Sequence, residues 1–198
     1  MNKPPDAETL SATPGQDGVP SEEQVIAATR VWLERAVIGQ QLCPFAAVPY
    51  RSDRVRFCVS AQRSADGLLE DLCRELQLLR DTDPLQCETT LLIHPHALND
   101  FLDYNDFLDV CDAAVAELGL EGELQVASFH PDYQFAGTRK QDITNFTNRS
   151  PYPMLHLLRE ASIERAAASF PDIDQIGPRN MDTLRRLGHE GWRRLWLD

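Results

Sequence analysis

The sequence contains no hydrophobic run long enough to cross a membrane, since a helical span needs about 18 or more apolar residues in succession. Its N-terminus also lacks the order of charged and then apolar residues that is typical of a signal peptide. Basic side chains are scarce, because 19 Lys and Arg stand against 31 Asp and Glu, for a net charge of −12. A surface that follows a phosphate backbone needs the opposite excess, so we expect neither nucleic acid nor a membrane as partner. The oligomeric state is left open.

Cysteine pairs with metal-binding or redox spacing are also missing. No CxxC motif occurs among the five cysteines, which are Cys43, Cys58, Cys73, Cys87 and Cys111. An odd number without regular spacing is typical of a reduced, cytoplasmic protein rather than of a disulfide framework. The chain likewise has no P-loop, no GxGxxG and no GxSxG, the signatures of common nucleotide-binding and serine-hydrolase sites.

The first 20 residues differ in composition from the rest of the chain. They hold four prolines and two glycines and almost no large apolar side chains. Such a segment cannot bury enough apolar surface to offset the entropy lost on ordering, which predicts a disordered tail over residues 1–20. We expect residues 21–198 to form a single α/β domain, a length that suits one core.

Apolar residues at helical spacing predict helices in the remainder, and short β-branched or aromatic runs predict strands. Ser21 with Gln24, then Ser64, then Asn99 or Asp100, are suitable residues for the helix starts. The predicted elements are a helix over 21–41, a strand over 54–60, a helix over 64–81, a strand over 89–93, a helix over 100–118, a strand over 123–130, and helices over 150–170 and 179–196.

This alternation favours an α/β fold, because helices of 12 or more residues between strands make crossover connections. We predict a small, mainly parallel sheet of three to four strands, with crossover helices and two C-terminal helices. Residues 45–53 are a candidate for the fourth, edge strand. The alternative is an α+β, ferredoxin-like arrangement with one strand antiparallel.

Two of the predicted strands end on the same dipeptide, His94-Pro95 and His130-Pro131. If the strands are parallel, both histidines lie at the carboxyl edge of the sheet, where open α/β sheets bind their ligands. Adjacent strands are about 4.8 Å apart, so the two imidazoles could reach one ligand. Alternatively, each His-Pro pair only terminates its strand, and both side chains are hydrogen-bonded and inert.

A long loop from Asp132 to Arg149 follows the second histidine. Loops of this length in a compact domain are usually functional, and the aromatic residues Tyr133 and Phe135 argue against disorder. We expect these two rings to form the wall of a binding site. Asp132, close to His130, would orient that imidazole.

The expected helix start at Ser150 suggests an anion site. A helix N-terminus has free N–H groups and a positive dipole end, and Arg149 adds a planar pair of donors beside it. His156, one to two turns later, would face the same site. The alternative is that Arg149 pairs with Asp132 or Asp142 and only holds the loop.

Two further readings of the histidines and cysteines stay open. His94, His96, His130 and Asp132 offer nitrogen and oxygen donors suited to a divalent metal, although no cofactor is predicted. Cys43 is the one cysteine expected in a loop, but it follows a helix C-terminus, which raises rather than lowers a thiol pKa.

Four sequence blocks resemble a known family. They are LCPFA at 42–46, TTLLIHP at 89–95, SFHPDYQFAGT at 128–138 and DITNFTNRSPYPMLHLLRE at 142–160. Together they resemble the bacterial and plant DUF1415 family, over about residues 22–196. The family is named for having no known function, so the resemblance implies no catalytic residue.

From the residues we predict a small-molecule enzyme, a hydrolase or transferase, that acts on an anionic substrate. His130 would be the general acid or base, with His94 as a second polar group, and Arg149 would hold the anion. One alternative is a metal-dependent enzyme. The other is a module without catalysis that binds a ligand or a protein.

Overall fold

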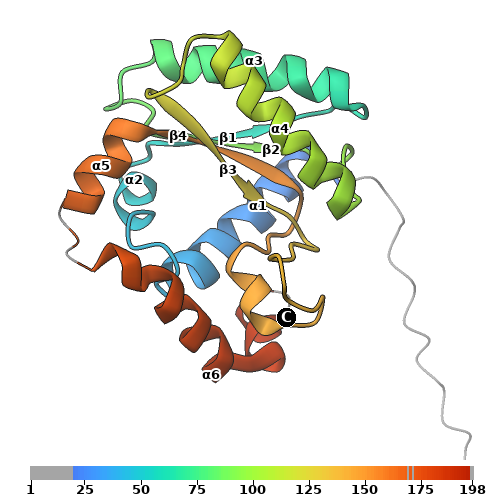
Figure 1. Cartoon of the computed structure of the whole chain (residues 1–198), viewed down its shortest axis with the longest axis vertical. Coiled ribbons are helices and arrows are strands. Elements are labelled where there is room, and N and C mark those ends of the chain that lie inside the picture. The colour runs from blue at the N-terminus through green and yellow to red at the C-terminus, as the bar shows by residue number, and fades with distance from the viewer. Residues whose placement is uncertain (1–19, 169, 171, 197–198) are drawn as a thin grey trace, which may run out of the picture.

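The computed structural model describes residues 20–168, 170 and 172–196. The predicted tail lies, except for Pro20, outside these residues. The elements in chain order are α1 Glu22–Trp32, η1 Leu33–Ile38, α2 Ala47–Arg51, β1 Val55–Val59, α3 Ala65–Asp81, β2 Thr89–Ile93, α4 Phe101–Glu117, β3 Leu124–Phe129, η2 Ile143–Thr147, β4 Met154–Arg159, α5 Glu160–Ala168, η3 Ile173–Gln175 and α6 Ile176–Trp196 (Figure 1).

The three predicted helix starts are confirmed by their caps. Ser21 and Gln24 form a complete capping box, each side chain accepting from the backbone N–H of the other. The Ser64 hydroxyl accepts from the N–H of Gly67, and Asp100 caps α4. Each of these side chains satisfies an N–H that has no partner within its helix.

The four strands form one sheet in the order β1-β2-β4-β3. Strands β1 and β2 are parallel, whereas β4 is antiparallel to both β2 and β3. The prediction of a mainly parallel sheet is therefore wrong, and the alternative with one antiparallel strand describes the pairing. Strands β1, β2 and β3 still run in the same direction, so their carboxyl ends share one edge.

The error comes from the stretch after Ser150. The predicted helix over 150–170 is a strand, β4, followed by the shorter helix α5. Its residues favour helices in isolation, but β4 fills the centre of the sheet and pairs on both sides, and such tertiary contacts override propensity. The candidate edge strand at 45–53 is wrong too, because this segment forms α2.

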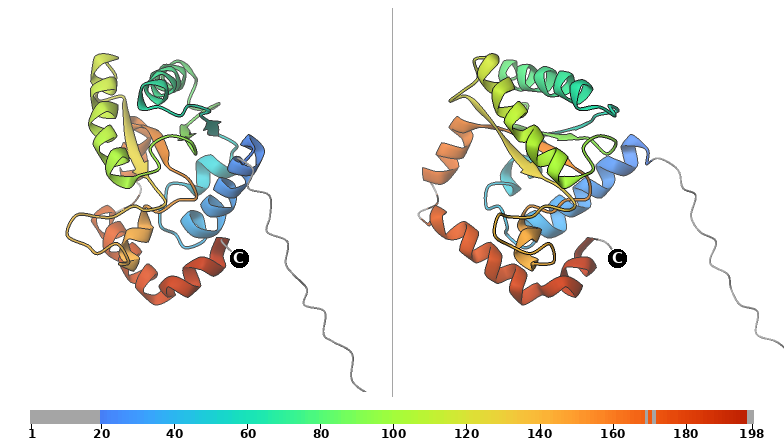
Figure 2. Two further views of the ribbon diagram at one scale, coloured as in Figure 1. Left: turned by 90° about the vertical axis from the view of Figure 1, so that its right-hand side faces the viewer. Right: turned by 45° about the vertical axis from the view of Figure 1, so that its right-hand side comes forward.

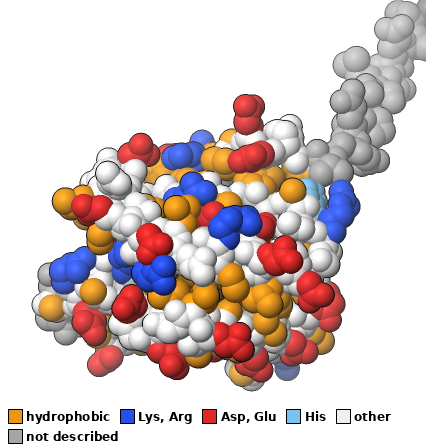
Figure 3. Space-filling model, turned by 90° about the horizontal axis from the view of Figure 1, so that it is seen from above, with side chains coloured by type: hydrophobic (Ala, Val, Ile, Leu, Met, Phe, Trp, Pro, Cys, Tyr) orange, Lys and Arg blue, Asp and Glu red, His pale blue; other side chains and the backbone are white. Residues whose placement is uncertain are grey.

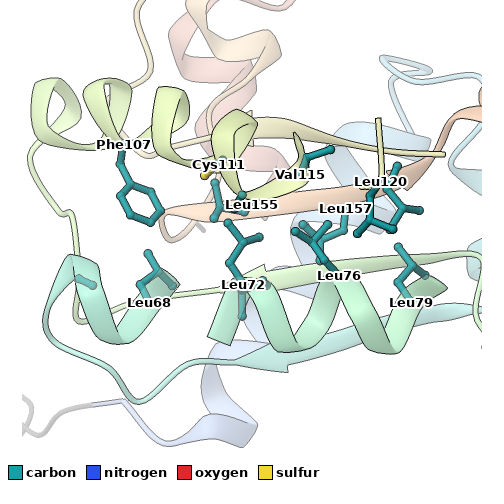
Figure 4. Packing of buried hydrophobic residues seen from close by; sticks show 14 of the residues in the cluster. Leu68, Leu72, Leu76, Leu79, Phe107, Cys111, Val115, Leu120, Leu155 and Leu157 are labelled. Carbon is teal, nitrogen blue, oxygen red and sulfur yellow. The ribbon is translucent and has the colours of Figure 1, made fainter. Parts of the chain in front are cut away.

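Helices α3 and α4 cover one face of the sheet, and α1, α2 and α6 lie on the other side (Figures 1 and 2). The covered face is closely packed. A leucine stripe on α3 meets Leu155 and Leu157 of β4, and α4, which lies beside α3 on the same face, adds further apolar side chains (Figure 4). The stripe consists of Leu68, Leu72, Leu76 and Leu79, all at most 1% exposed.

The second core lies against the opposite face of the sheet. Trp32, Ile93, Met154 and Trp192 are among its buried members.

None of the helices within the described residues has the length and apolar character needed to span a bilayer. Seen from above, acidic side chains are spread over the surface among basic and small apolar patches (Figure 3).

Candidate functional site

His94 and His130 lie at the same edge of the sheet, with the first residue of β4 between the strand ends that carry them. Tyr104 of α4 packs against both imidazoles. Its ring centroid is 5.7 Å from that of His94 and 5.0 Å from that of His130. We call His94, Tyr104 and His130 the edge cluster.

The nitrogens of His130 are both used by the backbone. Nδ1 accepts the N–H of Asp132 at 3.0 Å, so Nε2 carries the proton and faces the Leu98 carbonyl oxygen at 3.3 Å. Asp132 thus orients the imidazole through its backbone, while its carboxylate pairs with Lys140. Burial lowers the pKa of His130 below its usual value. The imidazole works here as a structural bridge between strand end and loops.

His94 is more deeply enclosed, with no exposed surface. Its Nδ1 lies 3.0 Å from the Ala97 carbonyl oxygen and donates to it, which leaves Nε2 as an acceptor. Among the described residues, Nε2 has no hydrogen-bond partner. Burial lowers the pKa of His94 to about 4, so the imidazole is neutral near pH 7.

Aromatic rings occupy the space around the edge cluster. Phe101 packs against His130 at 5.5 Å and against Tyr133 at 5.2 Å, and Tyr133 in turn meets Phe135 at 5.0 Å, between ring centroids. The Tyr104 hydroxyl donates to the Met154 carbonyl at 2.9 Å and accepts the Phe129 N–H at 3.0 Å, which ties α4 to two strands. The rings expected to wall a binding site, Tyr133 and Phe135, pack on each other, and Tyr133 is linked to His130 through Phe101.

Arg149 and Ser150 do not begin a helix. The Ser150 hydroxyl donates to the Tyr152 carbonyl in the turn before β4. Arg149 donates to the carbonyl oxygens of Tyr133 and Lys140, at 3.2 and 2.6 Å. The arginine therefore holds the loop, as the alternative reading proposed, but through carbonyls rather than through Asp132 or Asp142. The predicted anion site depended on a helix N-terminus at Ser150, and the structure has a turn and then β4 there.

The structure also gives no support to the alternative of a metal site. Within the residues that the structure describes, no group of three or more His, Cys, Asp or Glu side chains is placed to hold a metal ion. His96 follows β2 in a turn, and the carboxylate of Asp132 is taken up by Lys140. His94, His96, His130 and Asp132 are not arranged as a coordination site.

A different site lies on the face of the sheet opposite to α3 and α4. A cavity of about 540 Å³ is enclosed there by the sheet, α1 with η1, the segment through α2, and α5. We call it the sheet cavity. Its wall is mainly apolar, which is typical of small-molecule sites of this size. The apolar side chains in the wall include Trp32, Leu33, Val37, Phe45, Val55, Leu91, Phe129, Leu158, Ile163 and Phe170.

His156 brings a hydrogen-bonding group into this wall from the middle of β4. The Thr89 hydroxyl donates its only hydrogen to the Leu157 carbonyl at 2.6 Å. His156 Nε2, 2.7 Å from the same hydroxyl oxygen, must then be the donor. Nδ1 is consequently the unprotonated acceptor, and no described residue donates to it. Burial lowers the pKa of His156 to about 4, which keeps the ring neutral near pH 7.

One corner of the sheet cavity is charged but neutralised internally. Glu88 lies 2.6 Å from the Arg54 guanidinium and 3.6 Å from that of Arg165. The carboxylate is mostly buried, with 12% of its side chain exposed, so these pairs are screened less than surface pairs.

Arg159, at the end of β4, lies in the same corner. Its Nη2 donates to the carbonyl oxygens of Leu79, Thr82 and Cys87. These bonds hold the C-terminal turn of α3 and the segment before β2 against β4. Most polar groups of the corner are thus used in internal contacts, but the buried Nε of Arg159 has no hydrogen-bond partner among the described residues.

Cys43 lies in the wall of the sheet cavity. Burial raises the pKa of its thiol, with backbone hydrogen bonds from Phe45 and Ala46 opposing the shift. A thiol with a raised pKa is a poor nucleophile near neutral pH. Val48, also in the wall, is 64% exposed, which locates the opening of the cavity at α2.

Sequence reasoning did not single out Thr89 or Glu88, and it placed His156 in the wrong kind of element. The alternation of side chains along a strand could have placed Thr89 on a cavity-lining face. Thr89 and Leu91 project to the sheet cavity, while Leu92 projects to α3 and α4. His156 was assigned to a helix, which hid its place on this face of the sheet.

Comparison with known proteins gives a family but no function. Searches against curated proteins and against solved structures found no match. A family model described as a protein of unknown function, DUF1415, matches residues 24–194. The match covers the whole sheet and every residue of the two sites described above, and the chain belongs to the DUF1415 family.

Proposed function

We propose that this protein binds a small, mainly apolar molecule in the sheet cavity, with a hydroxyl or amide of that molecule donating to His156 Nδ1. The single observation that carries the proposal is the pairing of Thr89 with His156. It leaves one acceptor without a donor among the described residues, in a wall that is mainly apolar apart from its charged corner. A polar group inside an apolar site gives orientation and specificity to a ligand.

Binding is ranked above catalysis because the groups in this wall are poorly tuned for proton transfer. A general base works best with a pKa near the working pH, and the pKa of His156 is about 4. The raised pKa of Cys43 argues against a thiolate nucleophile in the same wall. The hydrolase or transferase hypothesis, with an anionic substrate at the edge cluster, is retained as the weaker proposal.

The test uses a neutral fluorescent apolar dye, Nile red, and its displacement by n-alkanols from hexanol to decanol. Each added CH₂ that enters the cavity contributes about 0.8 kcal/mol, so affinity should rise roughly fourfold per carbon until the cavity is full. An affinity that does not change with chain length would contradict binding in the sheet cavity.

A pair of variants locates the binding site of the alkanol. Ala166 lies in the cavity wall, whereas Ala168 is exposed two residues later on α5 and lies outside the wall. Ala166→Phe should fill the cavity and weaken decanol binding at least tenfold, while Ala168→Phe should leave it unchanged. Equal binding by both variants would place the alkanol elsewhere.

A further inference from the structure

A second hollow adjoins the sheet cavity. It has a volume of about 920 Å³ and lies between α6 on one side and η1, its following turn and α2 on the other. Cys43, Pro44 and Phe170 line both this hollow and the sheet cavity. Those three residues form a shared wall, so one ligand could extend from one space into the other.

The second hollow is rich in arginine, although the chain as a whole has a net charge of −12. Its described lining residues include one aspartate, Asp182, and four arginines, which are Arg51, Arg179, Arg185 and Arg186. We call this hollow the arginine groove. An excess of guanidinium groups in a concave surface attracts anions and raises their local concentration.

Two of these arginines are already paired and two are not. Arg185 lies 3.2 Å from Asp182, and Arg179 lies 3.1 Å from Asp172. Within the described part of the chain, Arg51 and Arg186 form no ion pair, and both side chains are exposed. Among the described residues, the Arg186 guanidinium donates only to neutral groups of its own helix, the Asp182 carbonyl at 3.4 Å and the Thr183 hydroxyl at 3.1 Å. A dianionic group offers acceptors to two guanidiniums, each of which presents a planar pair of donors.

The two sides of the groove are held together close to the shared wall. Asn180 of α6 is 5% exposed and donates to the Leu42 carbonyl at 2.8 Å, which fixes the segment carrying Cys43 against α6. Phe170 meets Phe45 of the sheet cavity edge-on, at 6.0 Å between ring centroids. The guanidinium of Arg179 lies 5.9 Å from the centroid of the same Phe170 ring. Apolar and cationic surroundings therefore meet at one aromatic ring.

We infer that the ligand of the sheet cavity carries a phosphate monoester, which binds in the arginine groove beside Arg51 and Arg186 while the apolar part enters past Phe170. This inference rests on the proposed function, because it assigns the second half of the same ligand. It also gives a place to the anionic small molecule that the sequence suggested, away from the edge cluster.

The experiment compares decyl phosphate with decanol, two ligands with the same chain and different head groups. Wild-type protein should bind decyl phosphate about tenfold more tightly in 20 mM salt, and this ratio should fall toward one in 0.5 M salt, where exposed charges are screened. In the Arg51→Gln/Arg186→Gln variant, the ratio should be close to one already in low salt.

The matched control is Arg63→Gln/Arg193→Gln, which removes two exposed arginines outside the groove and changes the net charge equally. It should keep the tenfold ratio, and circular dichroism and melting curves should show that both variants are folded. If decanol binds but decyl phosphate binds no more tightly, the inference is wrong and the proposed function stands. If neither binds, both are wrong. A ratio that survives in Arg51→Gln/Arg186→Gln overturns the arginine groove as the phosphate site.

Discussion

At the edge cluster, the imidazole nitrogens of His130 are bonded to the backbone and aromatic rings fill the surrounding space. In the sheet cavity, His156 bonds to Thr89 through one nitrogen, and the other has no donor among the described residues in the wall of a space of about 540 Å³. The residue type is the same, and in each site one imidazole nitrogen, His94 Nε2 or His156 Nδ1, has no hydrogen-bond partner among the described residues. The two sites differ in available volume, because His94 is enclosed with no exposed surface whereas His156 lines the sheet cavity. A histidine at a strand end is thus a weaker indication of a binding site than a histidine in the wall of an apolar cavity.

The largest expected difference concerns the two faces of β4. Leu155 is fully buried against α3 and α4, whereas Leu158 lines the sheet cavity. Leu155→Ala should lower the free energy of unfolding by about 3–4 kcal/mol, because it creates a void in a filled core. Leu158→Ala should cost only about 1 kcal/mol, since its side chain already borders open space. Urea denaturation measures both, and equal losses would contradict an open second face.

The next effect is a pH dependence that involves both sites. His94 and His156 each have a pKa of about 4 in the folded protein, against 6.5 as the usual value. Between pH 6.5 and 4 the unfolded chain takes up these protons and the folded protein does not. Stability should therefore fall as the pH is lowered through this window, by about 1.4 kcal/mol per pH unit for each histidine.

A glutamine variant separates the two contributions. His156→Gln keeps a donor for the Thr89 hydroxyl but removes one titrating group. Between pH 6.5 and 5 it should lose about 2 kcal/mol less stability than the wild type. His94→Gln should flatten the curve by the same amount, and the two effects should add because the residues lie in separate sites. An unchanged pH profile in His156→Gln would show that this imidazole is solvated. Asp71, whose pKa is lowered by hydrogen bonds from Ser60 and Arg74 despite burial, adds its own loss of stability at lower pH, as the unfolded chain takes up that proton near the usual carboxyl pKa.

A smaller loss is expected from the hydroxyl in the edge cluster. Tyr104→Phe leaves the Phe129 N–H without its acceptor and the Met154 carbonyl without its donor, inside a buried region. The cost should be about 1–2 kcal/mol in chemical denaturation. Decanol binding should not change, because this hydroxyl lies outside the sheet cavity. A loss of decanol binding in a folded Tyr104→Phe protein would show that the edge cluster takes part in ligand binding, which contradicts the separation of the two sites.

The helix starts were predictable because capping is local. Ser21, Ser64 and Asp100 each bond to an N–H two or three residues away, so sequence neighbours contain all the information. The common edge for His94 and His130 was also predictable, since it depends only on the direction of β2 and β3.

The position of β4 was not predictable in this way. The six residues from Met154 to Arg159 form a strand because they pair with β2 on one side and with β3 on the other. Both partner strands are distant from β4 in the sequence. The sheet cavity depends on the same event, as it needs His156 on one face of that strand. Arg149 shows the same limit, because its partners Tyr133 and Lys140 are set by the course of the loop.

The most direct test of the central claim is ¹⁵N NMR of the histidine side chains during titration with decanol at pH 7. We predict that the Nδ1 resonance of His156 moves as the alkanol hydroxyl donates to it, and that the resonances of His94 and His130 stay in place. The Ala166→Phe variant should show no movement at His156. If the His94 or His130 resonances move instead and those of His156 do not, the ligand binds at the edge cluster and the account given for the sheet cavity is wrong.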